Sequence, residues 1–219
     1  MRWRSRNVVL SGSDVTQLTD ISGNANHGTP ESAPQRPTYN ASDSGYGGKP
    51  SLAWTAANGT AVDSPALPAF GPFTIYHVLN VTTTGTYIHE LLTSAADWLY
   101  AGIGFTLFES ARGGSINITN AVAGAAWAQT GTPVIISRQF DGTAAGSKIF
   151  INGTIVPQTS IVPGDPGTTA QAWVLTLLSD AGGAGASDAT WAETIVYDNV
   201  VSAPDDAAIL AFLTSEYAL

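Results

Sequence analysis

Three carboxylates near the end of the chain are the first candidates for chemistry. Asp188, Glu193 and Asp198 are spaced by five residues. A glycan hydrolase needs two carboxyl groups that face each other across the scissile bond. Because side chains alternate between the two faces of a strand, an odd spacing places successive members on opposite faces. The spacing argues against a catalytic pair, and we interpret Glu193 as a structural hydrogen-bonding group in a strand.

Other catalytic patterns are missing from the sequence. It contains no cysteine and no Gly-x-Ser-x-Gly nucleophile motif. Its three histidines, His27, His77 and His89, stand alone, whereas a zinc site needs several ligands together. We expect His77 to be a core or an edge residue of a strand, and His27 to be a hydrogen-bonding residue of a turn. No catalytic residue is predicted, and we expect the chain not to be an enzyme.

Aromatic side chains in or beside loops of small residues are candidates for binding sugar. Trp98 and Tyr100 follow a run of small residues, and Trp127 stands within another. Exposed rings can form a platform for a sugar, so these three are the predicted ligand-binding residues. The alternative is that they close the ends of a β-sandwich as core side chains. The tryptophans expected in the core are Trp54, Trp173 and Trp191.

A calcium site is a second hypothesis. Asp20, Asn24 and Asn26 lie in one turn, and Asp180 and Asp188 flank a glycine-rich segment. Carboxylate and amide oxygens are the ligands that calcium takes. However, the Asp-x-Asp-x-Asp spacing is missing, and Asx-turn chemistry explains Asp20 equally well. No cofactor is required, and calcium remains a candidate.

Basic residues are concentrated at the start of the chain. Arg2, Arg4 and Arg6 are three of eight basic residues in a chain of net charge −9. They form either the solvated face of a first strand or an arm, within residues 1–14, that docks on an acidic partner such as a neighbouring subunit. The negative net charge argues against a nucleic-acid partner.

The elements that must position these residues are mostly strands. Asn152-Gly153 separates two apolar runs, and this dipeptide is a strong signal for a tight hairpin. The strands predicted most clearly are 73–81, 133–140, 148–151, 154–156, 171–178 and 190–197.

One helix is predicted, at the end of the chain. Ser202 is its expected cap, and Asp205 and Asp206 favour its first turn. Apolar residues then recur at helical spacing, and we expect the helix to pack on the edge of the sandwich. These apolar residues are Ile209, Phe212, Leu213 and Tyr217.

Several segments together resemble the laminin-G-like, concanavalin A-like jelly-roll domain. They are 15–29, 35–39, 48–52, the Asn152-Gly153 hairpin and 191–198. The resemblance implies an all-β, two-sheet antiparallel jelly-roll sandwich whose first and last strands lie side by side. The Glu-x-Asp-x-x-Glu cluster of glucanase relatives is missing here. The chain also departs from the family at its start, where arginines alternate in place of an apolar opening strand.

The length of 219 residues suits a single jelly-roll domain spanning residues 1–219. No signal peptide is recognisable at the start, and no run of about 18 apolar residues predicts a membrane span. The branch that the chain resembles occurs in bacterial surface proteins and phage structural proteins. A protein assembled in the host cytoplasm without an export signal fits the phage case.

The predicted function is therefore a phage virion structural protein on the particle surface, as capsid decoration, head fibre or tail-associated protein. We expect it to bind host or environmental glycans, such as cell-surface polysaccharide, and to contact other virion proteins or copies of itself. The alternatives are a shell-stabilising subunit that binds no sugar, and a non-viral, bacterial lectin-like module.

Overall fold

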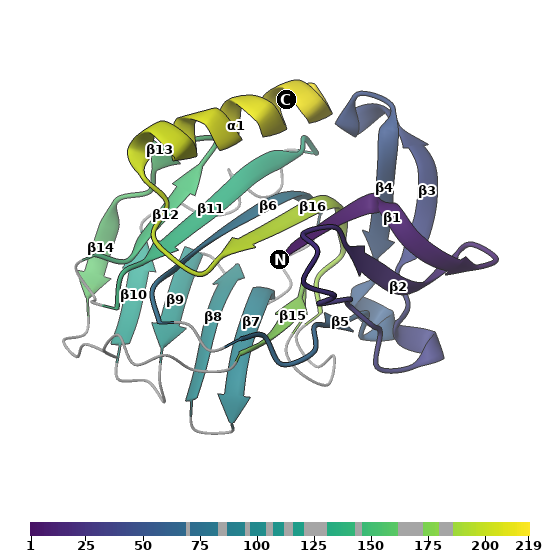
Figure 1. Ribbon diagram of the computed structural model, residues 1–219, viewed down its shortest axis with the longest axis horizontal. Helices are drawn as coiled ribbons and strands as arrows, with labels where there is room; N and C mark the ends of the chain where they lie inside the picture. The colour runs from purple at the N-terminus through teal and green to yellow at the C-terminus, as the bar shows by residue number, and fades with distance from the viewer. Residues whose placement is uncertain are drawn as a thin grey trace.

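The computed structural model describes residues 1–68, 71–82, 87–94, 97–103, 107–111, 116–120, 131–142, 146–161, 173–179 and 186–219. Between residues 87 and 120, and in 158–161, it describes the backbone alone. These residues form two antiparallel sheets and a C-terminal helix, α1 (Ala203–Tyr217), as Figure 1 shows. The predicted all-β sandwich with one C-terminal helix is confirmed.

The two sheets differ in size. In spatial order, the nine-stranded sheet contains β1 (Arg2–Ser11), β2 (Asp14–Asp20), β3 (Thr38–Asp43), β4 (Lys49–Trp54), β16 (Ala189–Tyr197), β6 (Phe73–Val81), β11 (Val134–Phe140), β12 (Lys148–Ile151) and β13 (Thr154–Ile155). The seven-stranded sheet contains β14 (Gln158–Ile161), β10 (Ile116–Asn120), β9 (Leu107–Ala111), β8 (Asp97–Ile103), β7 (Tyr87–Ser94), β15 (Val174–Leu177) and β5 (Val62–Asp63). Three short 3-10 turns lie at Ala33–Gln35, Ser44–Tyr46 and Ala56–Asn58.

The main core lies between the two sheets. Alternate residues of β6, such as Phe73, Ile75 and Leu79, meet Leu175 and Leu177 of β15 in one buried cluster. This alternation follows from the two-residue period of a strand. The predicted core tryptophans Trp54, Trp173 and Trp191 are all buried.

The outer face of the nine-stranded sheet carries a second apolar cluster, which α1 covers. Tyr76 and Val78 of β6 and Ile195 of β16 pack there against Leu213 and Tyr217 of the helix. The expectation that the helix packs on the edge of the sandwich was therefore wrong. Strand β6 is apolar on both faces because the opposite sheet covers one face and the helix the other.

A bulge in β16 changes which face its side chains occupy. Trp191 pairs with Leu79 of β6 and Glu193 pairs with Val78, so Ala192 is an extra residue in β16. Residues two apart on a regular strand share a face. The bulge instead places Trp191 in the main core and Glu193 on the outer face, beneath α1.

Residues 1–14 contain β1 and begin β2, so the arginine-rich segment is a strand within the sheet. The first and last strands lie side by side, because Trp3 of β1 pairs with Thr194 of β16. The side chain of Trp3 is fully buried in the main core. The sequence interpretation missed Trp3 as a core residue.

Two local predictions are confirmed. Asn152 and Gly153 have positive φ angles of 49° and 78° between β12 and β13, as a type I′ hairpin turn requires. At the start of α1, the side chain of Ser202 accepts a hydrogen bond from the backbone N–H of Asp205. Within the described part of the chain, no helix is both long and apolar enough to cross a membrane.

Candidate functional site

Trp98 and Tyr100 lie in strand β8. In the register of the seven-stranded sheet, Leu99 stands opposite Leu91, which stands opposite the core residue Leu175. Trp98 and Tyr100 therefore occupy positions of the other face, because they alternate with Leu99. Trp127 lies outside the described residues. A sugar platform formed by these three residues stays a prediction.

The arginines of β1 find an acidic partner within the same chain. The Nε atoms of Arg2 and Arg4 donate to Oε1 of Glu193, at 2.5 Å and 3.0 Å. The hydroxyl of Tyr217 donates to the other oxygen of Glu193 at 2.7 Å. We call these four residues the chain-end cluster. They join the first strand, the last strand and the C-terminal helix.

Glu193 is the buried centre of this cluster, as expected for a structural hydrogen-bonding group. Its side chain is fully inaccessible, whereas the side chains of Arg2 and Arg4 are 29% and 10% exposed. Burial raises the pKa of Glu193 above its usual value, and the hydrogen bonds from Tyr217 and Arg4 oppose that shift. Such a carboxylate positions other elements and is not exposed to a substrate.

The three arginines of β1 also contact the helix α1. Nη1 of Arg6 donates to Glu216 of α1 at 2.6 Å. The guanidinium groups of Arg2 and Arg4 lie 5.0 Å and 5.2 Å from the ring centre of Phe212, a distance typical of cation–π contact. Phe212, expected on the apolar face of the helix, is 40% exposed and contacts these cations. Docking of the arginines on a separate subunit stays a prediction, and all three already hold acidic groups of their own chain.

Asp20 organises the loop that joins β2 to the following segment. Its carboxylate accepts hydrogen bonds from the backbone N–H groups of Arg2, Ser22 and Asn26 and from the hydroxyl of Ser22. The backbone N–H of Asp20 donates to Nδ1 of His27 at 3.0 Å, which confirms His27 as a turn residue. Trp3 donates its indole N–H to the carbonyl oxygen of Asn26 at 2.7 Å. Residues 20–27 are therefore held in one conformation.

The described calcium candidates do not come together as a metal site. Both carboxylate oxygens of Asp20 accept hydrogen bonds from the loop, and Oδ1 of Asp188 accepts one from the backbone N–H of Ala56 at 2.7 Å. Asn24 belongs to the loop, and Asp180 lies outside the described residues. Among the side chains that the structure describes, no three His, Asp or Glu residues form a group able to hold a metal ion. Calcium binding stays a prediction that depends on Asp180.

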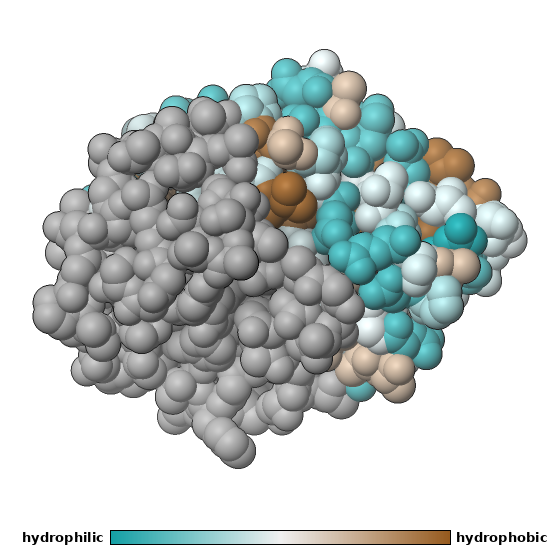
Figure 2. All heavy atoms as spheres, turned by 90° about the horizontal axis from the view of Figure 1, so that it is seen from below, coloured by the Kyte–Doolittle hydropathy of each residue, from teal (hydrophilic) through white to brown (hydrophobic). Residues whose placement is uncertain are grey.

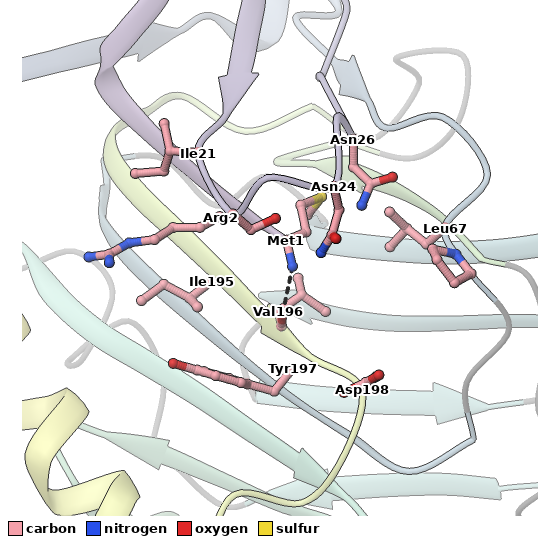
Figure 3. A pocket seen from close by; sticks show the side chains of 12 residues that line it. Met1, Arg2, Ile21, Asn24, Asn26, Leu67, Ile195, Val196, Tyr197 and Asp198 are labelled. Carbon is pink, nitrogen blue, oxygen red and sulfur yellow. Dashed lines mark hydrogen bonds between the residues drawn. The ribbon is translucent and has the colours of Figure 1, made fainter.

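A pocket of about 410 Å³ lies between this loop and the end of β16 (Figure 3). We call it the loop pocket. One wall is the loop, with the amides of Asn24 and Asn26, and the opposite wall is the end of β16, with Asp198. The guanidinium group of Arg2 points away from both amides in Figure 3. The lining residues are Met1, Arg2, Ile21, Ser22, Asn24, Asn26, Leu67, Pro68, Ile195, Val196, Tyr197 and Asp198.

Asn26 is the residue that makes this pocket a candidate site. The residue as a whole is only 8% exposed, and its side-chain amide forms no hydrogen bond to another described residue. The amide atoms are not among the fully buried polar atoms that lack a partner, so they keep contact with the pocket. The amide lines the pocket and is therefore placed to receive a ligand's hydrogen bonds.

The sequence did not reveal the loop pocket. It marked Asn24 and Asn26 as oxygen donors of a turn, but the opposite wall comes from Leu67 and from Tyr197 and Asp198. The one available signal was the density of Asp, Ser and Asn residues between positions 20 and 26. That signal predicts a well-formed turn and does not indicate what the turn faces.

Large apolar side chains are scattered over the described surface. The exposed ones include Val9, Leu10, Ile21, Ile155 and Val200. On the face in Figure 2, the described part is mainly hydrophilic, with apolar residues in small separate groups. Isolated apolar residues of this kind are ordinary on a protein surface, so their exposure alone does not identify a site.

Comparisons with known proteins identify the fold. No protein-family model matches the chain, and no curated protein matches its sequence. A similar solved structure is domain 4 of AbnA, an extracellular GH43 arabinanase of Geobacillus stearothermophilus, in complex with arabinotriose. The match covers 99% of this chain and 96% of that domain, with a TM-score of 0.63 and 14% identity.

Two toxin structures are also similar. The binding domain of Paraclostridial Mosquitocidal Protein 1 matches 96% of this chain, with a TM-score of 0.63 and 11% identity. A botulinum neurotoxin type C, whose cell entry depends on two ganglioside molecules, matches 92%, with a TM-score of 0.57 and 13% identity. The matches cover 52% and 51% of those two chains, about half their length. The chain therefore has the predicted jelly-roll sandwich fold, which it shares with modules of this kind.

Proposed function

We propose that this chain is a non-catalytic glycan-binding module and that the loop pocket is its binding site. The observation that carries the proposal is Asn26, a residue that is only 8% exposed and whose side-chain amide lines the pocket without a hydrogen bond to another described residue. Sugars present hydroxyl groups that both donate and accept hydrogen bonds. A side-chain amide offers the complementary donors and acceptor.

The rest of the pocket supports the same ligand class. Leu67, Pro68 and Ile21 offer apolar surface, and Tyr197 offers an aromatic ring. Asn24 and Asp198, both exposed, add an amide and a carboxylate at the rim. Apolar surface combined with a few fixed polar groups is typical of small-ligand sites. The structure with arabinotriose gives this fold a sugar-bound counterpart along its whole length.

The first test measures binding of the purified protein to bacterial surface polysaccharides, whole cells and arabinotriose. The affinity for each ligand that binds is then measured by calorimetry. We expect saturable binding that Asn26→Ala weakens by about three- to tenfold, the loss of one hydrogen bond. The substitution keeps the loop intact, because Asp20 and Trp3 hold only the backbone of Asn26. Asn58→Ala, which removes an exposed amide outside the pocket, is the matched control.

Two results would overturn the proposal. One is the failure of a folded protein to bind any glycan of the panel, which would favour the shell-stabilising subunit without sugar binding. The other is an unchanged affinity in Asn26→Ala. Repeating the assay with a calcium chelator tests the calcium prediction separately, since that prediction requires binding to be lost.

Placement on a phage particle, in the head or the tail, stays a prediction, as does the alternative of a bacterial lectin-like module. The described fold and pocket suit both. Detection of the protein in purified particles by mass spectrometry would distinguish the two.

A further inference from the structure

A second hollow of about 490 Å³ adjoins the loop pocket. It follows the chain from the end of β16 to the first turns of α1, and its lining residues are Tyr197, Asn199, Val200, Val201, Ser202, Asp205, Ala208 and Ile209. Tyr197 lines both hollows. The two hollows therefore share one aromatic residue.

Tyr197 is held in place by a ring contact. Its ring meets the ring of Tyr76 edge-on, with centroids 6.2 Å apart and planes at 87°. Its side chain is partly exposed, and its hydroxyl has no hydrogen-bond partner among the residues that the structure describes. Aromatic rings with a polar tip suit a ligand that has both apolar and hydroxyl surface.

The segment that follows Tyr197 is also anchored. The hydroxyl of Thr74, in β6, donates to the carbonyl oxygen of Asn199 and accepts from the N–H of Val201, both at 3.0 Å. Ser202 and Asp205 bond to each other at the helix cap. The second hollow is thus formed before any ligand arrives, which lowers the entropy cost of binding.

The charge of the second hollow narrows the ligand class. Its described lining includes the carboxylate of Asp205 and no Lys or Arg side chain. In the loop pocket, the guanidinium group of Arg2 is already bonded to Glu193, and the terminal ammonium of Met1 donates to the carbonyl oxygen of Val196. Each hollow also presents an exposed carboxylate, that of Asp198 or Asp205, which repels an anionic group. Ligands bearing carboxylate or phosphate are therefore disfavoured.

We infer, on the basis of the proposed function, that the two hollows form one groove and that its ligand is a linear oligosaccharide of neutral sugars that crosses Tyr197. One end of the oligosaccharide binds at Asn24 and Asn26. The following units pass the ring of Tyr197 and lie against residues 199–202 and Ala208. Affinity then depends on chain length, because each further unit gains contacts until the second hollow is filled.

Calorimetry with arabinose and arabino-oligosaccharides of two to six units tests this, with cello-oligosaccharides as a second neutral series. We expect affinity to rise by about tenfold or more between two and five units and then to level off. Ala208→Trp fills the second hollow and should remove that gain while leaving disaccharide binding within about twofold. Ala207→Trp is the matched control, since Ala207 is exposed on the same helix and does not line the hollow.

The outcomes separate the two proposals. If no member of either series binds and the polysaccharide panel is also silent, the proposed function itself fails. If disaccharides bind as tightly as hexasaccharides, the loop pocket binds sugar alone and the groove is refuted. The groove is also refuted if the affinity of Ala208→Trp still rises with oligosaccharide length. The oligosaccharide would then leave the loop pocket by another path.

Discussion

The chain-end cluster and the loop pocket share Arg2 and strand β16, and they use polar side chains in opposite ways. In the cluster, both oxygens of Glu193 receive donors from the protein, and α1 covers them. In the pocket, Asn26 is only 8% exposed as a residue, yet no described residue bonds to its amide. Burial of the residue alone therefore does not distinguish a structural polar group from a binding group. The difference here is that Glu193 is bonded within the chain and that the Asn26 amide lines a pocket.

This contrast predicts that changes to the cluster alter stability and that changes to the pocket alter binding. The largest expected effect is that of Glu193→Ala. It leaves two arginine side chains, mostly buried, without their carboxylate, and such a loss costs about 3–5 kcal/mol of unfolding free energy. Urea denaturation, monitored by tryptophan fluorescence, measures this loss of unfolding free energy.

The matched comparison for that variant is Asn26→Ala, which should keep the parent's stability and lose affinity. The contrast fails if Glu193→Ala is as stable as the parent, because the ion pairs would then contribute nothing. It also fails if Asn26→Ala unfolds as easily as Glu193→Ala, since the pocket amide would then be structural.

A smaller effect is expected of Tyr217→Phe. This change removes only the hydroxyl that donates to Glu193 and keeps the ring that packs in the outer cluster. A hydrogen bond to a charged acceptor contributes about 2 kcal/mol. Denaturation of the single variant and of Tyr217→Phe combined with Glu193→Ala gives the coupling between the two residues. Strictly additive losses would show that the hydroxyl does not act through Glu193.

The smallest effect, over the pH range from 6.5 to 5, concerns the protonation of a polar group of the main core. His77 is fully buried, forms a 2.8 Å hydrogen bond with Thr194, and burial together with the nearby Arg138 lowers its pKa to about 3. The unfolded chain binds a proton at His77 below a pH of about 6.5, where the folded protein does not. Protonation therefore favours unfolding, and stability falls as the pH decreases from 6.5 towards 3, by at most about 1.4 kcal/mol per pH unit.

His77→Gln is the variant that isolates this dependence, because glutamine keeps a polar side chain and does not titrate. Denaturation at several pH values between 6.5 and 5 compares the two proteins before most carboxylates titrate. We expect the variant to lose less stability than the parent over this range. Equal slopes would mean that His77 is protonated in the folded protein as easily as in the unfolded chain.

Local signals in the sequence predicted much of the fold. The Asn152-Gly153 turn, the Ser202 cap and the buried tryptophans each depend on residues close together in the chain. The alternating arginines of β1 were harder to interpret, because their partner Glu193 is about 190 positions away. Without that partner in view, Trp3 between two arginines looked like part of a solvated strand or arm.

The candidate site could be predicted only in part. The turn at 20–27 was visible, since Asp20 and Asn26 are typical turn residues. The opposite wall, formed by Leu67 and the end of β16, depends on the packing of segments distant in sequence. The lack of a partner for the Asn26 amide is a property of three-dimensional surroundings, and no local pattern predicts it.

The extra residue Ala192 reverses the alternation of inward and outward side chains in the last strand. Before it, Trp191 fills the core between the sheets, and after it Val196, five positions on, fills the same core. In an unshifted strand these two residues would face opposite ways. The two halves of the strand thus follow opposite patterns of inward and outward side chains. The extra alanine keeps Trp191 in the core and Glu193 on the outer face, where each side chain has its partners. Removing that alanine would therefore exchange the inside and outside of half the strand, and would not merely shorten it by one residue.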